Sequence, residues 1–349
     1  MMTNVSETLW TGSHYRISVS RSPSYEWLMF AANTRFGQQD ALYRRTALLS
    51  EIAYFRSAWF FTVHHNDVVV GCYVIDERHL QRAGQPVSGL YRGLLAIAPR
   101  HRRRGLARRC VRVAVEWALR HCAEIALSYG CVDANNEASI AMLASAGMRH
   151  IGTQGSVLKY HQWQRHVPAR IAITEALTDS AASLRESLLA GDSLFDRGAS
   201  ETDEWITATD GSSLAACRHR LVTLNLDPMQ GVAGIITEHL LDAFPPGRRR
   251  FDPRAFRYIA MNDAIASGPD ATALFGQLTR YLMARHEVHF VNVSLDDGDG
   301  SDSTQSIRAS LGRRRVANRR RIHVLGQWHK KTPDTEVPGA LMLLSAPDL

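Results

Sequence analysis

The fold of this chain is decided by the segment Leu95-Ala96-Ile97-Ala98-Pro99-Arg100-His101-Arg102-Arg103-Arg104-Gly105-Leu106-Ala107-Arg108. Here an apolar strand pattern ends at Pro99, and an arginine-rich turn leads into the helical periodicity of residues 106–121. The first backbone N–H groups of a helix have no partner within it and lie at the positive end of its dipole. The segment therefore predicts an anion site at the start of a helix.

The residue types of the turn indicate which anion fits. Gly105 allows a close approach of the backbone, and the small Ala107 leaves the helix start uncrowded. The arginines at 102–104 add charge-assisted hydrogen bonds, so we expect a pyrophosphate. The alternative is a basic turn that is simply solvated.

Apolar periodicity around this turn predicts an α+β order of elements. A hairpin signal, His65-Asn66-Asp67, joins two of the strands, and Gly147 is suited to the left-handed cap of a helix. The expected elements are a strand at 15–19, helices at 25–36 and 40–56, strands at 59–64, 68–75 and 90–98, a helix at 106–121, a strand at 125–132, a helix at 138–146 and a strand at 151–160.

The second half of the chain repeats this order, which makes a duplicated fold plausible. The pattern breaks at residues 165–170, so we expect two domains, 1–165 and 170–349. The expected elements of the second are a helix at 177–189, strands at 205–208, 219–226 and 256–261, a helix at 271–286, a strand at 288–295, a short helix ending at 311, and strands at 322–328 and 340–344.

Composition limits the class of protein. With 349 residues, 45% of them hydrophobic and 21% charged, the chain is long enough for two globular cores. Its five cysteines are odd in number and form no CxxC pair, so we expect reduced thiols and no structural metal. No apolar stretch is long enough to span a membrane, and no secretory signal is evident, so we expect a cytoplasmic protein.

The formal charge of +7 comes mainly from arginine clusters at 100–112, 248–250 and 313–321. Such a balance favours an anionic partner: nucleic acid, a membrane surface or a phosphorylated cofactor. Only the first cluster stands in a context that decides between them. For the other two, a solvated surface is the simplest interpretation.

Two motifs in this order resemble those of the GNAT acyltransferase superfamily. Ile97-x-Pro99 followed by Arg102, Gly105 and Ala107 is similar to the family's strand end and its Q/R-x-x-G-x-G/A cofactor turn. About thirty residues later, the segment 136–148 is similar to the family's Asn motif, helix and Gly-Phe. The resemblance covers about residues 10–163.

The resemblance implies the GNAT fold, a mixed central sheet flanked by helices, and acetyl-CoA or another acyl-CoA as cosubstrate. The backbone of Leu95 and Ile97 would pair with the pantetheine arm, and Asn136 would bond the arm from the other side. An N-cap role for Asn136 is the equal alternative. The residues expected to contact the cofactor are Leu95, Ile97, Arg102, Arg103, Arg104, Gly105, Leu106, Ala107, Arg108 and Asn136.

The sequence lacks the proton-transfer residues that many members of this superfamily carry. Where many relatives carry a tyrosine acid this chain has Leu143, and where some carry a glutamate base it has Cys131. A backbone N–H near Ile97 would stabilise the developing oxyanion. The side chains proposed for proton transfer are Tyr91, Asp133 and Tyr160, with His150 as a further candidate; each also has a structural alternative, in a loop, a cap or packing.

The second half lacks the cofactor signature. Residues 264–271, which stand at the position of the arginine turn, contain no arginine and include Asp270. Near Ser303, at the position that corresponds to Asn136, there is no Asn. We therefore expect a degenerate GNAT-like domain that cannot hold CoA and that forms one wall of the acceptor pocket.

The leading hypothesis is an N-acyltransferase that moves an acetyl or other short acyl group from acyl-CoA to the primary amine of a small molecule. The alternatives are a non-catalytic acyl-CoA-binding or regulatory protein and an aminoacyl-tRNA-dependent transferase. The intact pyrophosphate turn argues against the last, so nucleic acid and membrane are not expected as partners. A homo-oligomer is compatible with the sequence.

Overall fold

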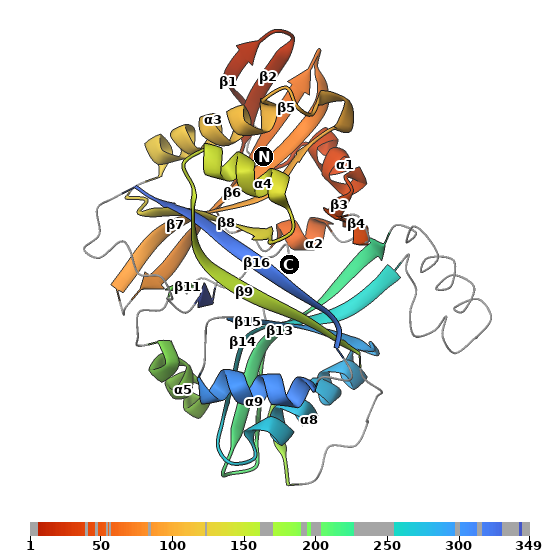
Figure 1. The fold of residues 1–349 in the computed structure, drawn as a ribbon, viewed down its shortest axis with the longest axis vertical. Coiled ribbons are helices and arrows are strands. Elements are labelled where there is room, and N and C mark those ends of the chain that lie inside the picture. Colours follow the sequence, from red (N-terminus) through yellow and green to blue (C-terminus); the bar gives the residue numbers. More distant parts are fainter. Residues whose placement is uncertain are drawn as a thin grey trace, which may run out of the picture.

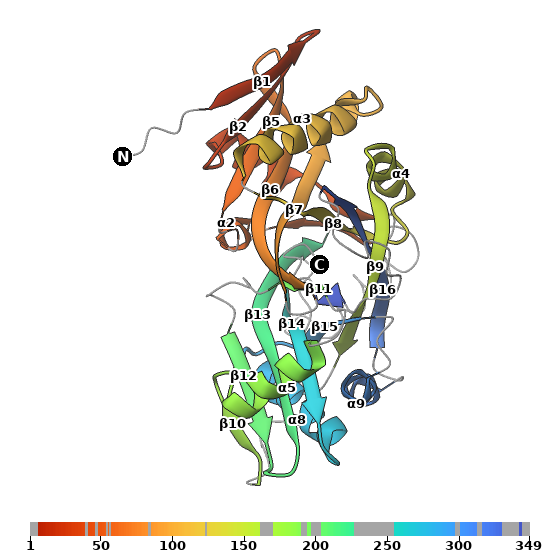
Figure 2. The same ribbon diagram turned by 90° about the vertical axis from the view of Figure 1, so that its left-hand side faces the viewer.

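The structure is a computed structural model and is drawn in Figures 1 and 2. It describes residues 6–38, 41–45, 48–53, 55, 57–82, 85–122, 124–160, 170–189, 194–196, 204–226, 255–296, 301–312, 316–329 and 342–343. None of the described helices is long and apolar enough to cross a membrane.

The first half builds a mixed sheet with helices on both faces, as expected for an α+β fold. Its elements are β1 (Glu7–Gly12), β2 (Tyr15–Ser20), α1 (Tyr25–Asn33), β3 (Phe36–Gln38), β4 (Ala41–Arg45), α2 (Leu48–Ile52), β5 (Ala58–His65), β6 (Val68–Arg82), β7 (Gln85–Ile97), η1 (Pro99–His101), α3 (Leu106–His121), β8 (Leu127–Asp133), α4 (Glu137–Ser145) and β9 (Arg149–Tyr160).

Alternation along β5 divides the core of this half into two layers. Trp59 and Phe61 face α3 and pack edge to face with Trp117 of that helix. Phe60 faces the other way and packs against Trp27 of α1. The sheet is therefore fixed between two helices, which holds β6 and β7 rigidly at its centre.

The second half repeats the layering. Its elements are β10 (Ala172–Thr174), α5 (Asp179–Leu189), β11 (Leu194–Asp196), β12 (Glu204–Thr209), β13 (Leu214–Leu226), β14 (Phe256–Ser267), α8 (Ala271–Arg285), β15 (Phe290–Asp296), α9 (Asp302–Leu311), β16 (Val316–Trp328) and β17 (Met342–Leu343). Helix α8 covers one face of β13 and β14, and α5 covers the other.

The two halves exchange their last strands. Strand β9 of the first half pairs with β15 of the second, from Phe290↔Tyr160 to Asp296↔Gln154. Strand β16 of the second half lies between β8 and β9 and is antiparallel to both. In both views β9 and β16 run side by side from one half into the other (Figures 1 and 2). One sheet therefore passes through the whole molecule.

Most predicted elements are confirmed, but the first half differs in β1, in β4 and in β3, which begins at the end of the predicted helix 25–36. The predicted helix at 40–56 is wrong: the described residues of that stretch form β4 and the short helix α2. Strand β1 lies before the first predicted strand and pairs with β2. The expected linker at 165–170 lies outside the described residues except for Arg170, and the arginine clusters at 248–250 and 313–315 lie outside them entirely.

Candidate functional site

Strands β7 and β8 part at the centre of the first half. They pair in parallel from Gly89↔Leu127 to Arg92↔Gly130, and no described residue beyond Arg92 continues this pairing. Just after that point β7 carries a bulge, because its register with β6 shifts between Cys72 and Val74. The strands therefore form a V that opens toward their carboxyl ends.

Leu94 marks the bulge, with a left-handed φ of +51° that is uncommon for a leucine. Its carbonyl oxygen accepts a hydrogen bond from Cys72 Sγ at 3.2 Å, and its side chain is buried against the α1 layer. These contacts hold the bulge in place, and with it the bend that separates β7 from β8.

The backbone of Ile97 faces the inside of the V. The Ala98 N–H donates to Val70 O at 2.8 Å, which makes this a hydrogen-bonded pair of the β6–β7 ladder. Because such pairs alternate in an antiparallel ladder, the N–H and C=O of Ile97 point away from β6, toward the gap. The C=O accepts from Arg102 Nε at 2.9 Å.

The turn at the mouth of the V leads into α3 through two left-handed residues, Arg103 with φ +61° and Gly105 with φ +73°. Gly105 is the N-cap of α3 and supplies no side-chain cap. A Cβ added to Gly105 would meet no atom within 4 Å, so the space in front of the helix start is open. The first N–H groups of α3 therefore face an open space, as an anion site requires.

The arginines of the turn divide into two kinds. Arg102 is tied to the Ile97 carbonyl, and Arg104 lies 3.4 Å from the hydroxyl of Tyr15, which in turn contacts His101 Nδ1 at 3.0 Å. Arg103 and Arg108, which are exposed like Arg102 and Arg104, lie outside these contacts. The first kind braces the turn, and the second is free to reach a ligand in solution.

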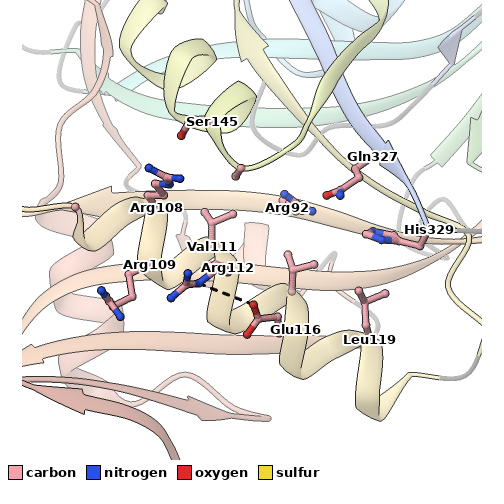
Figure 3. A pocket seen from close by; sticks show the side chains of 13 residues that line it. Arg92, Arg108, Arg109, Val111, Arg112, Glu116, Leu119, Ser145, Gln327 and His329 are labelled. Carbon is pink, nitrogen blue, oxygen red and sulfur yellow. Dashed lines mark ion pairs between the residues drawn. The ribbon is translucent and has the colours of Figure 1, made fainter.

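A groove of about 670 Å³ lies between α3, α4 and β16 (Figure 3). Of the residues predicted to contact the cofactor, Gly105 and Arg108 line it. It also contains side chains that no sequence pattern groups together, since they come from β7 and from the far end of the chain: Arg92, Gln327 and His329.

Residues 24–148 match the model of the Acetyltransferase (GNAT) family. These residues form a GNAT domain. They contain the V, the turn and α3, and end one residue after Gly147, whose φ of +87° confirms the predicted left-handed cap. No protein of curated function is significantly similar to the sequence.

Solved structures extend the likeness to the whole chain. The Saccharomyces cerevisiae N-myristoyltransferase with bound myristoyl-CoA and inhibitors is 8% identical, with a TM-score of 0.61 over 98% of this chain and 89% of that one. A tandem GNAT protein from the clavulanic acid biosynthesis pathway is 13% identical, with a TM-score of 0.52 over 88% of this chain and 95% of its own. The chain thus has the tandem GNAT fold.

The match to a third structure covers a smaller share of that structure's chain. The GCN5-related N-acetyltransferase from Kribbella flavida is 12% identical, with a TM-score of 0.43, and the match covers 77% of this chain and 59% of that one.

Asn136 caps α4 in the structure. Its side-chain oxygen accepts from the Ser139 N–H at 3.1 Å, so the N-cap interpretation of this residue is confirmed. A contact between Asn136 and the pantetheine arm stays a prediction, since the cap does not use the amide nitrogen.

The residues proposed for proton transfer lie in three different environments. Tyr91 is 1% exposed and packs against Tyr129, with the Arg78 guanidinium 5.3 Å from its ring centre. Asp133 ends β8 at the mouth of the V, where its Oδ1 accepts from the Asn135 N–H at 2.9 Å. For Tyr160 only the backbone is described, paired with Phe290. Neither Tyr91 nor Asp133 is among the residues that line the groove.

His150 makes a contact of its own, 2.9 Å from Thr153 Oγ1, and lies edge to face with His323. Partial burial, with a smaller contribution from His323, lowers the pKa of His150. Two positions lack the tyrosine acid and the glutamate base that were expected from the resemblance. Leu143 is buried against Met148 and Leu325, and Cys131 is half-buried.

The second half contains a matching V that is filled by the chain itself. Strands β14 and β15 pair in parallel only from Ile259↔Val291 to Met261↔Val293, and the β13–β14 register shifts between Ala216 and Arg218. The bulge carries Asp263 with φ +48°, close to the value at Leu94. The geometry of the first V is thus repeated.

Two hydrogen bonds and the close packing at Gly268 close this second V and its turn. Ser303 Oγ accepts from the Ala266 N–H at 2.9 Å, and Ser213 Oγ accepts from the Asp270 N–H, also at 2.9 Å. A Cβ on Gly268 would lie 2.6 Å from the Ser212 carbonyl oxygen. The space that is open at Gly105 is therefore occupied by the β12–β13 hairpin in the second half.

Among the residues that the structure describes, no group of three or more His, Cys, Asp or Glu side chains is arranged to hold a metal ion.

Proposed function

We propose that this chain is an acyl-CoA-dependent N-acyltransferase that transfers an acetyl or other short acyl group to the primary amine of a small molecule. The observation that carries the proposal is the open V between β7 and β8, with the uncapped start of α3 at its mouth. A GNAT domain with this feature unfilled has room for the thioester of an acyl-CoA.

The residues present fit the substrate. The backbone N–H groups of the turn would hold the pyrophosphate, with Arg103 and Arg108 as exposed cations beside it. The Ile97 N–H, which faces the gap, would stabilise the negative charge that develops on the carbonyl oxygen. The pantetheine arm would extend the sheet along Leu95 and Ile97, with the amide of Asn136 opposite.

In the reaction the amine nitrogen attacks the thioester carbon, a C–N bond forms, and the C–S bond breaks. One proton leaves the nitrogen and one is gained by the thiolate. Of the candidates for these transfers, Asp133 has the most favourable place, because it ends β8 at the mouth of the V. Tyr91 and Tyr160 remain further proposals.

The filled V of the second half supports a single acyl-CoA site in the chain. We propose that this half forms a wall of the acceptor pocket. Two solved structures that share the fold of the whole chain are named for different chemistry: one for N-myristoyl transfer and one for the clavulanic acid pathway. A peptide amine therefore belongs in any acceptor screen.

Substitution of Gly105 tests acyl-CoA binding. Acetyl-CoA at a hundred times its dissociation constant should stabilise the parent protein by about 2.7 kcal/mol. Gly105→Glu should remove this stabilisation, because a carboxylate at the helix start repels the pyrophosphate and fills its place. The measurement is thermal unfolding with and without acetyl-CoA.

Gly211→Glu is the matched control, since Gly211 also has a positive φ, of +91°, and also faces open space, but lies in the β12–β13 turn. It should lose stability to a similar degree and keep the response to acetyl-CoA. If acetyl-CoA fails to stabilise the parent, the proposed cofactor is wrong. If it stabilises the parent but releases no thiol with a broad panel of amines and peptides, a non-catalytic acyl-CoA-binding role replaces the transferase.

A further inference from the structure

Arg92 is a buried cation for which the described residues supply no carboxylate partner. Arg92 is the last residue of β7 that pairs with β8, and only 6% of it is exposed. Its Nη1 contacts Met148 Sδ at 3.0 Å, its Nη2 donates to Ser128 Oγ, and its Nε has no hydrogen-bond partner. Within the described part of the chain, no Asp or Glu pairs with it.

Such an arrangement is unfavourable in the absence of a ligand. Buried charges in proteins are normally paired, because burial removes the hydration that stabilises them. Burial lowers the pKa of Arg92 and outweighs Tyr73, which acts in the opposite direction. An arginine nevertheless keeps its proton, so the groove holds a permanent positive charge.

The surroundings of Arg92 form a site with a polar floor and an apolar wall. Figure 3 shows the guanidinium between Val111 of α3 and Gln327 of β16. His329 Nε2 lies 2.8 Å from the same Ser128 hydroxyl that Arg92 contacts. The apolar wall consists of α3 side chains one turn apart: Val111, Val115 and Leu119.

Charge at the rim favours an anion as well. Three exposed arginines line the groove along α3: Arg108, Arg109 and Arg112. Glu116 is the one carboxylate among the lining residues, and it lies 3.9 Å from Arg112 on the exposed side. An incoming anion therefore meets a positive entrance and a positive floor.

The geometry points to a binding site in this groove for a carboxylate on a short apolar chain, with Arg92 as its anchor. A planar carboxylate matches the guanidinium fork, and its single charge balances the single fixed charge of the floor. The chain packs on the wall of α3. Arg92 itself lies outside the pyrophosphate turn, although Gly105 and Arg108, which we assign to the pyrophosphate, line the same groove.

Two sources supply this chemistry: a free carboxylic acid, or an acyl-CoA whose acyl group ends in a carboxylate. The second source rests on the proposed function, whereas the first does not. The experiments are arranged to separate them.

Free hexanoate tests the site itself. Calorimetric titration of the parent should show saturable binding of hexanoate at millimolar concentration, but not of hexan-1-ol at the same concentration. Arg92→Met should weaken hexanoate binding about tenfold or more, as expected for loss of a charge-assisted contact. Arg120→Met, at an exposed α3 position outside the groove, should leave it unchanged.

The thermal stability of the Arg92 variants distinguishes a residue that anchors a ligand from one with a purely structural role. Without ligand, Arg92→Met should melt at or above the temperature of the parent, because it removes an unpaired buried charge. If this variant fails to fold, Arg92→Lys, which keeps the charge but not the fork, should fold and bind hexanoate more weakly. Equal effects of hexanoate and phosphate on parent and variant would indicate charge screening only and overturn the site, as would absence of hexanoate binding to the parent.

Succinyl-CoA and butyryl-CoA distinguish the sources. Tighter binding of succinyl-CoA by the parent, lost in Arg92→Met, places the carboxylate on the acyl group. If the parent binds both thioesters equally and also binds hexanoate, the carboxylate belongs to a molecule other than the acyl-CoA. The Arg92 site is supported in either case. Hexanoate binding by a parent protein that binds no acetyl-CoA would contradict the proposed function while supporting this site.

Discussion

Replacing Val324 with aspartate should unfold both halves of the protein together. Val324 is fully buried on β16, between Cys131 of β8 and Gly152 of β9, and packs in a cluster with Leu80 and Tyr129. An isolated carboxylate in such a place costs several kcal/mol or takes up a proton. That cost is a large part of the roughly 5–15 kcal/mol that stabilises a typical domain.

Circular dichroism during thermal unfolding measures this result. Val68→Asp is the matched control, because Val68 is 65% exposed at the start of β6, and it should change stability by less than about 0.5 kcal/mol. Val324→Ala should give an intermediate loss of about 2 kcal/mol. A Val324→Asp protein that keeps one half folded, seen as a separate transition, would show that the exchanged strands do not couple the halves.

Asp263→Ala should destabilise the protein by about 3–5 kcal/mol. Asp263 is 4% exposed and forms ion pairs with Arg218 at 2.9 Å and Arg185 at 3.3 Å. Arg218 is itself buried, so removal of the carboxylate takes an ion-pair partner away from a buried cation. Unfolding in urea, compared with the parent, gives the difference in free energy.

An exposed ion pair provides the contrast. Arg16 and Asp67 also lie 3.0 Å apart, but their side chains are 39% and 90% exposed. Arg16→Gln should therefore cost less than about 1 kcal/mol. If Asp263→Ala costs no more than Arg16→Gln, the buried cluster at the second bulge does not stabilise the fold as its geometry indicates.

The sequence predicted the elements with the strongest periodicity and the clearest ends. The predicted helix at 106–121 coincides with α3, whose apolar face is buried against β5 and whose start is marked by Gly105. The hairpin around Asn66 and Asp67 is confirmed by their left-handed φ values of +46° and +64°. In both cases local residue types determine the backbone, and distant contacts only reinforce it.

Long-range contacts explain what the sequence did not reveal. Residues 41–45 have helical spacing, yet they form β4 because they pair with β3 and with the end of β13. The place of β16 between β8 and β9 depends on pairing across the halves and leaves no local pattern. In the sequence, Arg92 stands out as a single charged residue in an apolar strand. That signal indicates a specific site only once the fold brings Ser128 and His329 close to Arg92.

The exchanged strand also sets the order in which the protein can mature during synthesis. Ser128 and His329, which lie in contact, are 201 positions apart, and among the described strands it is β16 that completes the edge of β8. While the ribosome is still translating the second half, the nascent first half has its V and its turn but an unpaired β8 edge. Such an edge can pair with other chains. We therefore expect the newly made protein to depend on chaperones until residue 328 has emerged from the exit tunnel.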